Sequence, residues 1–134
     1  MGEKYVPGKC NIGVRGRVMR ASTGAIVIGV AFWAGLFGQT GRLAALRLVL
    51  VLPFYVGLLA VLEAGMSFCV LHASRGTYDF HEKIGPVGRS TSRAVVEVDE
   101  WKRMDRRKAR IMYVEALAGA VLLTLVLFLV RFWA

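Results

Sequence analysis

Three apolar blocks constrain this chain more than any other feature of its sequence. Residues 21–38 carry no charged side chain, residues 48–71 carry only Glu63, and residues 111–130 carry only Glu115. A helix of about 20 apolar residues crosses the hydrocarbon core of a bilayer. Inside that core each backbone N–H and C=O must be paired within its own segment. Each block is therefore predicted to form a transmembrane helix.

A soluble fold is the alternative for any single apolar block, because a buried core helix shows the same composition. Here 56% of the 134 residues are hydrophobic, and three such blocks leave too little polar surface for a soluble domain. We expect an all-α integral membrane protein with a helix 1–helix 2 hairpin, a cytoplasmic amphipathic segment and a third membrane helix. No cleavage site follows the first block, so helix 1 is expected to be retained rather than removed as a signal peptide.

The basic residues predict the orientation of these helices. The net charge is +9, and fifteen of the eighteen Lys and Arg residues precede helix 1 or lie between residues 75 and 110. By the positive-inside rule both regions are cytoplasmic and the C-terminus is outside, as in a multi-pass protein of the inner (cytoplasmic) membrane. Anionic lipids are thus expected partners, and nucleic acid is not. The predicted interface residues are Arg15, Arg17, Arg20, Trp101, Arg106, Arg107, Lys108 and Arg110.

The chain divides into three predicted parts. Residues 1–78 hold the N-terminal tail and the hairpin, residues 79–110 a cytoplasmic loop and an interfacial helix, and residues 111–134 the last membrane helix. The second helix is expected over Leu43–Leu71, with a kink at Pro53 because proline removes a backbone hydrogen bond. Apolar residues recur every three positions at Val95, Val98, Trp101 and Met104, which predicts an amphipathic helix lying in the interface.

Small residues recur at helical spacing in the first two blocks. Small side chains let membrane helices approach closely, so we expect these two faces to pack together. The residues are Ala21, Ala25 and Gly29 in helix 1, and Gly57, Ala60 and Ala64 in helix 2.

Two acidic residues lie inside the predicted membrane helices. An acid at membrane depth is costly, so Glu63 is either a proton relay or cation ligand, or a carboxyl paired with a neighbouring helix or an interfacial arginine. Glu115 lies one turn inside helix 3, near enough to pair with Arg110 or a headgroup amine.

The two cysteines are far apart in sequence but are predicted to meet at one membrane face. Cys10 in "KCNIG" precedes helix 1, and Cys69 in "SFCVLH" ends helix 2, so a hairpin brings both to the cytoplasmic side. His72 follows Cys69 on the same helical face. Two thiolates and an imidazole suit a metal or redox site, although a closed zinc site needs a fourth ligand. The alternative is two unreactive interfacial thiols. His72 and His81 are also candidate ligands for haem or a chlorophyll-type pigment.

Two stretches give the chain a family resemblance. "CNIGVRGRVMR" and "AGMSFCVLHASRGTYDF" resemble the opening turn and closing segment of the YgaP-like two-helix transmembrane family over about residues 9–78. The matching positions of the closing segment are Gly65, Phe68, Cys69, Leu71, Gly76 and Thr77, while Val70 replaces the family's Pro and His72 its Tyr. The resemblance implies a membrane hairpin, and its association with rhodanese domains implies sulfur handling in some members. This chain adds a basic segment and a third helix.

No catalytic motif stands out, so we do not expect an enzyme. There is no phosphate-binding loop, dinucleotide fingerprint, HExxH or CxxC motif. We expect a non-catalytic accessory subunit that binds other membrane-protein subunits, with a respiratory or photosynthetic electron-transfer complex as a natural host. The alternatives are a thiol, sulfur or metal-binding module using Cys10, Cys69 and His72, and haem or pigment binding. Bound lipid is expected, and no other cofactor is assigned.

Overall fold

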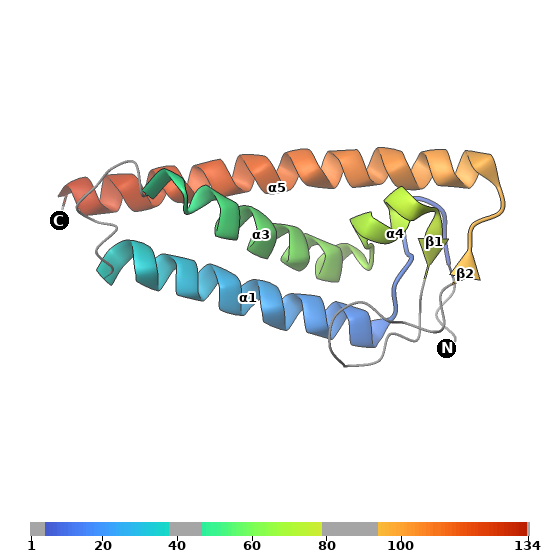
Figure 1. Ribbon diagram of the computed structural model, residues 1–134, viewed down its shortest axis with the longest axis horizontal. Coiled ribbons are helices and arrows are strands. Elements are labelled where there is room, and N and C mark those ends of the chain that lie inside the picture. The colour runs from blue at the N-terminus through green and yellow to red at the C-terminus, as the bar shows by residue number, and fades with distance from the viewer. Residues whose placement is uncertain (1–4, 38–46, 79–93, 134) are drawn as a thin grey trace.

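The computed structural model describes residues 5–37, 47–78 and 94–133, and within them the fold is mostly helical. Figure 1 shows α3 between α1 and α5, and α3 packs against both of these helices. The short elements α4, β1 and β2 gather near the start of α5, at the same end as the N-terminus (Figure 1). The helices are α1 (Val14–Phe37), α3 (Val51–Met66), α4 (Val70–Arg75) and α5 (Asp99–Trp133), and the strands are β1 (Thr77–Tyr78) and β2 (Ala94–Val95).

Two of these helices are long and apolar enough to cross a membrane. They are α1, with 24 residues, and the part of α5 from Asp99 to Val130. The apolar helix α3 has only 16 residues, which is shorter than the single span predicted over Leu43–Leu71. The packed core runs along the bundle in two clusters of buried residues. One contains Ala31, Leu50, Phe54, Ala120 and Leu127, and the other contains Phe68, Val70, Ala73, Ala109 and Met112.

A left-handed residue ends α3 earlier than predicted. Ser67 has φ 54° and ψ 38°, and the following amide of Phe68 donates to the Glu63 carbonyl at 3.0 Å. A left-handed residue of this kind is a common helix stop, because it turns the chain while pairing a terminal carbonyl. The chain then starts a new helix, α4, at Val70. Residues 67–71 are therefore a turn and a separate helix rather than the end of α3.

Pro53 was predicted to kink the middle of the second helix, but it lies at the beginning of α3. A turn at residues 49–50 precedes the helix, and the Leu52 amide donates to the Val49 carbonyl at 3.1 Å. Proline has no N–H to donate, and its ring crowds the carbonyl four residues earlier, which is that of Val49. Pro53 thus lies in the first turn of α3, where proline is tolerated.

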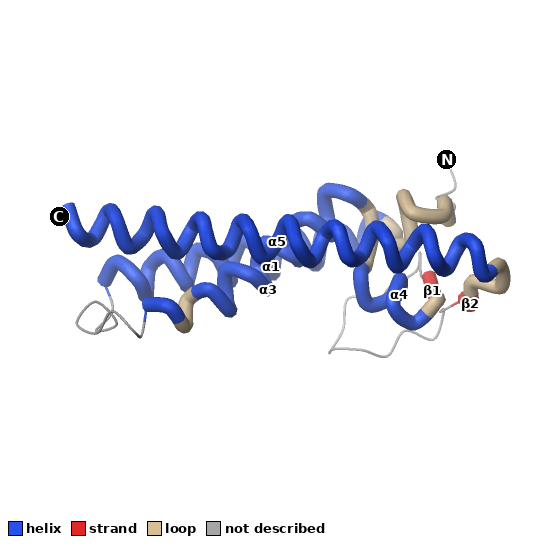
Figure 2. Tube along the Cα trace, turned by 90° about the horizontal axis from the view of Figure 1, so that it is seen from above, coloured by secondary structure: helices blue, strands red, loops and turns tan. Residues whose placement is uncertain are grey.

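The predicted interfacial helix and the last membrane helix form one continuous helix. Helix α5 has 35 residues, a length of about 52 Å at 1.5 Å per residue, against about 30 Å for a hydrocarbon core. Figures 1 and 2 show it running the whole length of the molecule. Val95 belongs to β2 and Val98 precedes the helix, so the predicted amphipathic pattern was wrong at its first two positions. The segment before residue 111 continues the axis of α5 and does not lie flat as a separate element.

A short antiparallel sheet joins α4 to the start of α5. Thr77 pairs with Val95, Tyr78 pairs with Ala94, and the Val96 amide donates to the Gly76 carbonyl at 2.8 Å. Gly76 has φ +68°, a left-handed conformation that favours glycine. This sheet and an isolated antiparallel β-bridge between Val6 and Cys10 are departures from the predicted all-α fold.

Glycines bring α1 and α3 into close contact, but in a different register from the prediction. A Cβ added at Gly24 would lie 2.7 Å from the Gly57 carbonyl oxygen, and one added at Gly57 would lie 2.6 Å from Ile28 Cγ1. By contrast Ala21, Ala25 and Gly29 are exposed, and a Cβ at Gly29 would meet nothing within 4 Å. The small-residue face predicted for helix 1 was therefore wrong as the face that meets α3. Helix α1 carries small residues on two faces, and the one containing Gly24 makes the contact.

The face predicted for helix 2 does include the contact residues. Gly57 and Ala64 are buried and Ala60 is half-buried. Helix α3 has a single face of small residues, so the sequence allowed one prediction of its contact face. Helix α1 has two such faces, and the sequence does not distinguish between them.

Candidate functional site: a polar cluster at the end of the hairpin

Asn11 joins the two cysteine-containing stretches. Its side chain is fully buried, its Nδ2 donates to the Cys69 carbonyl at 3.0 Å, and its Oδ1 accepts from the Cys69 amide at 2.6 Å. The Asn11 amide also donates to the Ser67 carbonyl at 3.0 Å. A buried backbone turn must have its polar groups paired, and Asn11 supplies partners for three of them. The two stretches therefore meet, but through Asn11 rather than through Cys10.

Glu63 accepts hydrogen bonds from α1 and from α4 at once. Its Oε2 accepts from Arg20 Nε at 3.0 Å, and its Oε1 accepts from the Val70 amide at 3.0 Å. Val70 is the first residue of α4, and a carboxylate there pairs an amide that has no partner within the helix. Cys69 is buried beside this carboxylate, and its amide is bound to Asn11. We call Asn11, Arg20, Glu63 and Cys69 the Glu63 cluster.

The arginines predicted at the lipid interface divide into different roles. Arg20 Nη1 donates to the Gly16 carbonyl at 3.0 Å while its Nε is bound to Glu63. Arg17 Nε donates to the Ala64 carbonyl of α3 at 2.9 Å. Arg15 is exposed. Two of the three basic residues at the start of helix 1 thus bind α3 within the chain.

The Cys10, Cys69 and His72 side chains do not form the predicted three-ligand set. All three residues are described, and no group of three His, Cys, Asp or Glu residues in the described part of the chain could hold a metal ion. The Cys10 thiol donates to the Ile12 carbonyl at 3.7 Å, and His72 Nδ1 pairs with Thr77 Oγ1 at 3.0 Å. His81 lies outside the described residues.

The Cys69 thiol is not poised as a nucleophile. Cys10 and Cys69 form no disulfide. Burial, with the nearby negative charge of Glu63, raises the pKa of the Cys69 thiol. The thiolate is the reactive form of cysteine, so a raised pKa disfavours thiol exchange and metal binding.

A second buried acid holds the N-terminal tail against α5. Asp105 is fully buried, and its carboxylate accepts from Tyr5 Oη and from the Gly8 amide, each at 2.7 Å. The Tyr5 ring stacks on Tyr78 with centroids 4.6 Å apart and lies 6.1 Å from Trp101. Burial and the bond to Asp105 raise the pKa of Tyr5. Trp101, predicted as a lipid anchor, is thus also part of an aromatic contact with the tail.

Glu115 does not make the predicted pair with Arg110. Glu115 is exposed, and the salt bridges among the described residues join Arg20 to Glu63 and Lys102 to Asp99. A spacing of five residues places two side chains on different faces of a helix, whereas spacings of three or four bring them together.

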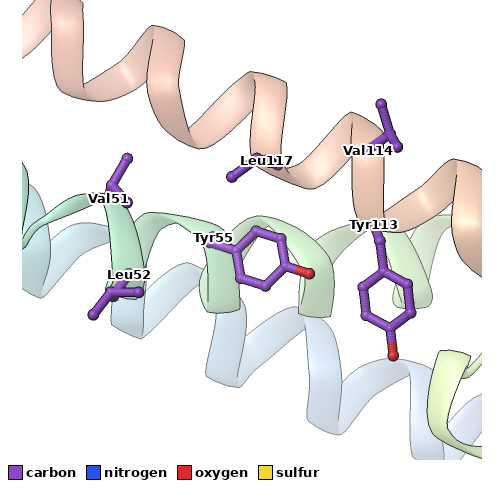
Figure 3. Close-up of a pocket in the computed structure, with 6 residues that line it drawn as sticks. All are labelled: Val51, Leu52, Tyr55, Tyr113, Val114 and Leu117. Carbon is purple, nitrogen blue, oxygen red and sulfur yellow. The ribbon is translucent and has the colours of Figure 1, made fainter.

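Two cavities lie along α5 and share Tyr113. The first, of about 370 Å³, is an apolar groove between α3 and α5 (Figure 3), and the second, of about 420 Å³, lies between α4 and α5. The groove is lined by Val51, Leu52, Tyr55, Tyr113, Val114 and Leu117. The second cavity is lined by Ser74, Arg106, Ala109, Arg110 and Tyr113.

Sequence reasoning identified Glu63, Arg20 and Cys69 but not Asn11 or Asp105. Asn11 carried one usable signal, since it is an uncharged polar residue beside the glycine turn of "KCNIG". Asp105 lies in a run of charged residues and is the one that is buried, which composition does not reveal. Comparisons with protein-family models, curated proteins and solved structures find no match to this chain.

Proposed function

We propose that the protein is a non-catalytic, multi-pass membrane subunit that joins other membrane proteins in a larger complex. The observation that carries this proposal is that potentially reactive side chains are buried where the helices meet. The carboxylate of Glu63 accepts hydrogen bonds from Arg20 and from the Val70 amide, and the thiol of Cys69 is buried with a raised pKa. Residues held in this way position helices and have little freedom to take part in a reaction.

The proposal includes three membrane spans. Helix α3 is about 24 Å long at 1.5 Å per residue, and it packs between two helices that are long enough to cross. Where α1 and α5 cross a bilayer, the apolar helix between them crosses with them. The excess of basic residues in residues 1–20 and 75–110 supports a cytoplasmic N-terminus and an external C-terminus, in the cytoplasmic membrane.

The outer surfaces of the bundle suit lipid and partner helices. Apolar side chains are exposed along both long helices, among them Ile26, Val30 and Trp33 on α1 and Leu122 and Leu125 on α5. Large exposed apolar surfaces mark contacts with membranes or with other proteins. A respiratory or photosynthetic electron-transfer complex is one host with membrane subunits of this kind.

We do not extend the proposal to sulfur, metal or pigment chemistry. The Cys69 thiol is buried with a raised pKa, and His72 is buried and bound to Thr77. No observation on the described residues favours either alternative.

Isolation of the tagged full chain from native membranes in a mild detergent tests the proposal. The expected result is a particle of constant composition that contains further membrane proteins. A Gly24→Leu variant, in which the α1–α3 contact is blocked, is expected to lose those proteins, whereas the matched Gly65→Ala variant keeps them because a Cβ there meets nothing within 4 Å. A wild-type chain that runs alone as a monomer overturns the proposal.

A further inference from the structure

We propose that α3, α4 and α5 form a binding site for one anionic phospholipid of the cytoplasmic leaflet. Its phosphate is held by Arg106 and Arg110 in the cavity between α4 and α5, and an acyl chain lies in the apolar groove between α3 and α5. The inference rests on the membrane insertion contained in the proposed function, but it does not depend on any protein partner.

The polar half of the site carries two positive charges. Arg106 and Arg110 lie four residues apart, on one face of α5, and both are exposed. Among the residues that the structure describes, neither arginine has a carboxylate within salt-bridge distance. Guanidinium groups bind phosphate through paired N–H donors. The cavity therefore presents unneutralised donors suited to an anionic headgroup.

The remaining polar group of the cavity does not compete for that role. Ser74 Oγ donates its hydrogen to the Val70 carbonyl at 2.9 Å, so the arginines and the Tyr113 hydroxyl supply the donors. The two arginines recognise a phosphate by its charge. The apolar part of α5 begins directly after Arg110, so the cavity lies where the polar and apolar parts of this helix meet. Basic pockets between membrane helices at the cytoplasmic side are a known arrangement for lipid headgroups.

The apolar half of the site adjoins the polar half at Tyr113. This residue lines both cavities, and Figure 3 shows its ring extending from α5, with the Tyr55 ring in the groove beside it. The other lining side chains of the groove are aliphatic. A free anion makes no use of the groove, and in a zwitterionic lipid such as phosphatidylcholine the choline cation opposes the attraction of the phosphate to the two arginines. The two cavities together fit an amphiphile that has an anionic head and an acyl chain.

Native mass spectrometry of the detergent-solubilised full chain tests this assignment. The probes are phosphatidylglycerol, phosphatidylcholine with the same acyl chains, and inorganic phosphate. We expect one phosphatidylglycerol to bind at least about tenfold more tightly than phosphatidylcholine, because both lipids offer a phosphate but only phosphatidylcholine also brings a choline cation close to the two arginines. Inorganic phosphate is expected not to displace it, because phosphate lacks the acyl chain.

A matched pair of variants locates the site. Arg106→Gln with Arg110→Gln is expected to abolish the preference for phosphatidylglycerol. Arg103→Gln with Arg107→Gln removes the same charge from the same exposed helix, outside the cavity, and is expected to keep it. A Leu52→Trp variant, which fills the groove and leaves both arginines in place, is expected to weaken both lipids.

Three results overturn the proposal: equal binding of the two lipids, displacement by inorganic phosphate, or equal losses in the two arginine pairs. The last of these indicates a diffuse charge effect. Lipid binding is measured on the single chain, so failure here leaves the partner proposal standing. Conversely, if no other membrane protein co-purifies with the chain, the lipid-binding proposal is unaffected. Extraction of the chain from membranes by alkaline carbonate contradicts the membrane insertion on which both rest.

Discussion

The two arginine-containing regions at the α4 end of the bundle differ in how their charges are balanced. In the Glu63 cluster, Arg20 is bound to a buried carboxylate and to the Gly16 carbonyl. In the cavity between α4 and α5, Arg106 and Arg110 have no carboxylate partner among the described residues. The sequence shows both regions as basic residues beside an apolar block. Only the position of Glu63 distinguishes a charge that holds the fold from a charge that faces outward.

This difference has an energetic meaning. A buried ion pair gives little net stability, but removing one partner leaves an uncompensated buried charge. An exposed arginine is hydrated by solvent, and its removal leaves no buried charge without a partner. Its substitution therefore changes the free energy of unfolding little. Substitutions in the Glu63 cluster should therefore lower the stability of the fold. Substitutions of Arg106 and Arg110 should change only the affinity for the lipid.

The largest expected effect is that of Glu63→Ala. It removes the carboxylate that balances the charge of Arg20 and accepts from the Val70 amide, at a cost of about 3–5 kcal/mol in the free energy of unfolding. The measurement is unfolding in mixed micelles with increasing dodecyl sulfate, followed by circular dichroism. The matched control is Arg110→Ala, an exposed charge, with an expected change within about 0.5 kcal/mol. Equal effects of the two substitutions would remove the contrast between the regions.

The next effect concerns two glycines on different faces of α1. Gly24→Ala places a Cβ 2.7 Å from the Gly57 carbonyl oxygen, and this overpacking is expected to cost about 1–3 kcal/mol. Gly29→Ala meets nothing within 4 Å and is expected to stabilise the helix by about 0.5–1 kcal/mol, because alanine has the higher helix propensity. The same unfolding measurement checks the opposite signs. A destabilising Gly29→Ala would place the contact on the face that the sequence predicted.

Much of the fold could be predicted because it follows from composition along the chain. The apolar blocks predicted helices at α1, α3 and the second half of α5, and the structure has helices there. The ends of the helices were harder to predict from the sequence, because they depend on contacts between distant parts of the chain. Helix α3 stops at Ser67, a residue with no strong stop signal, where Asn11 and Glu63 pair the backbone of the following turn. Those partners come from other parts of the chain.

The candidate site was predicted only in part for a similar reason. Glu63 was conspicuous because a charge in an apolar block needs a partner, and an interfacial arginine was one of the partners expected, although Arg20 was not singled out. Asn11 and Asp105 were missed because polar residues in polar segments are usually solvated, and only tertiary packing buries these two. The cysteines attracted attention as rare reactive residues, but they form no disulfide, the Cys10 thiol donates to the Ile12 carbonyl, and the Cys69 thiol is buried.

A loss of stability similar to that of Gly24→Ala is expected from Asn11→Ala. The substitution removes a donor to the Cys69 carbonyl and an acceptor for the Cys69 amide, both buried. Buried polar groups left without partners cost about 1–3 kcal/mol. Hydrogen exchange of the Cys69 amide, followed by nuclear magnetic resonance, reports the local opening directly. Asn11→Asp is the control variant, since it keeps the acceptor for the Cys69 amide and loses the donor. Protection of that amide should therefore survive in Asn11→Asp and disappear in Asn11→Ala.

The smallest expected effect is a pH dependence from Tyr5. Its pKa is raised in the folded state by burial and by the hydrogen bond to Asp105, so the folded chain holds the phenolic proton more tightly than the unfolded chain. The corresponding stability is fully present below the ordinary tyrosine pKa of about 10 and is lost as the pH rises above it. Unfolding measured between neutral and strongly alkaline pH should show this decline in the wild type. Tyr5→Phe cannot ionise, so its decline above the ordinary pKa should be shallower, although it starts from lower stability because the bond to Asp105 is gone. Parallel curves for the two proteins would mean that the Tyr5–Asp105 contact does not hold the tail against α5 in solution.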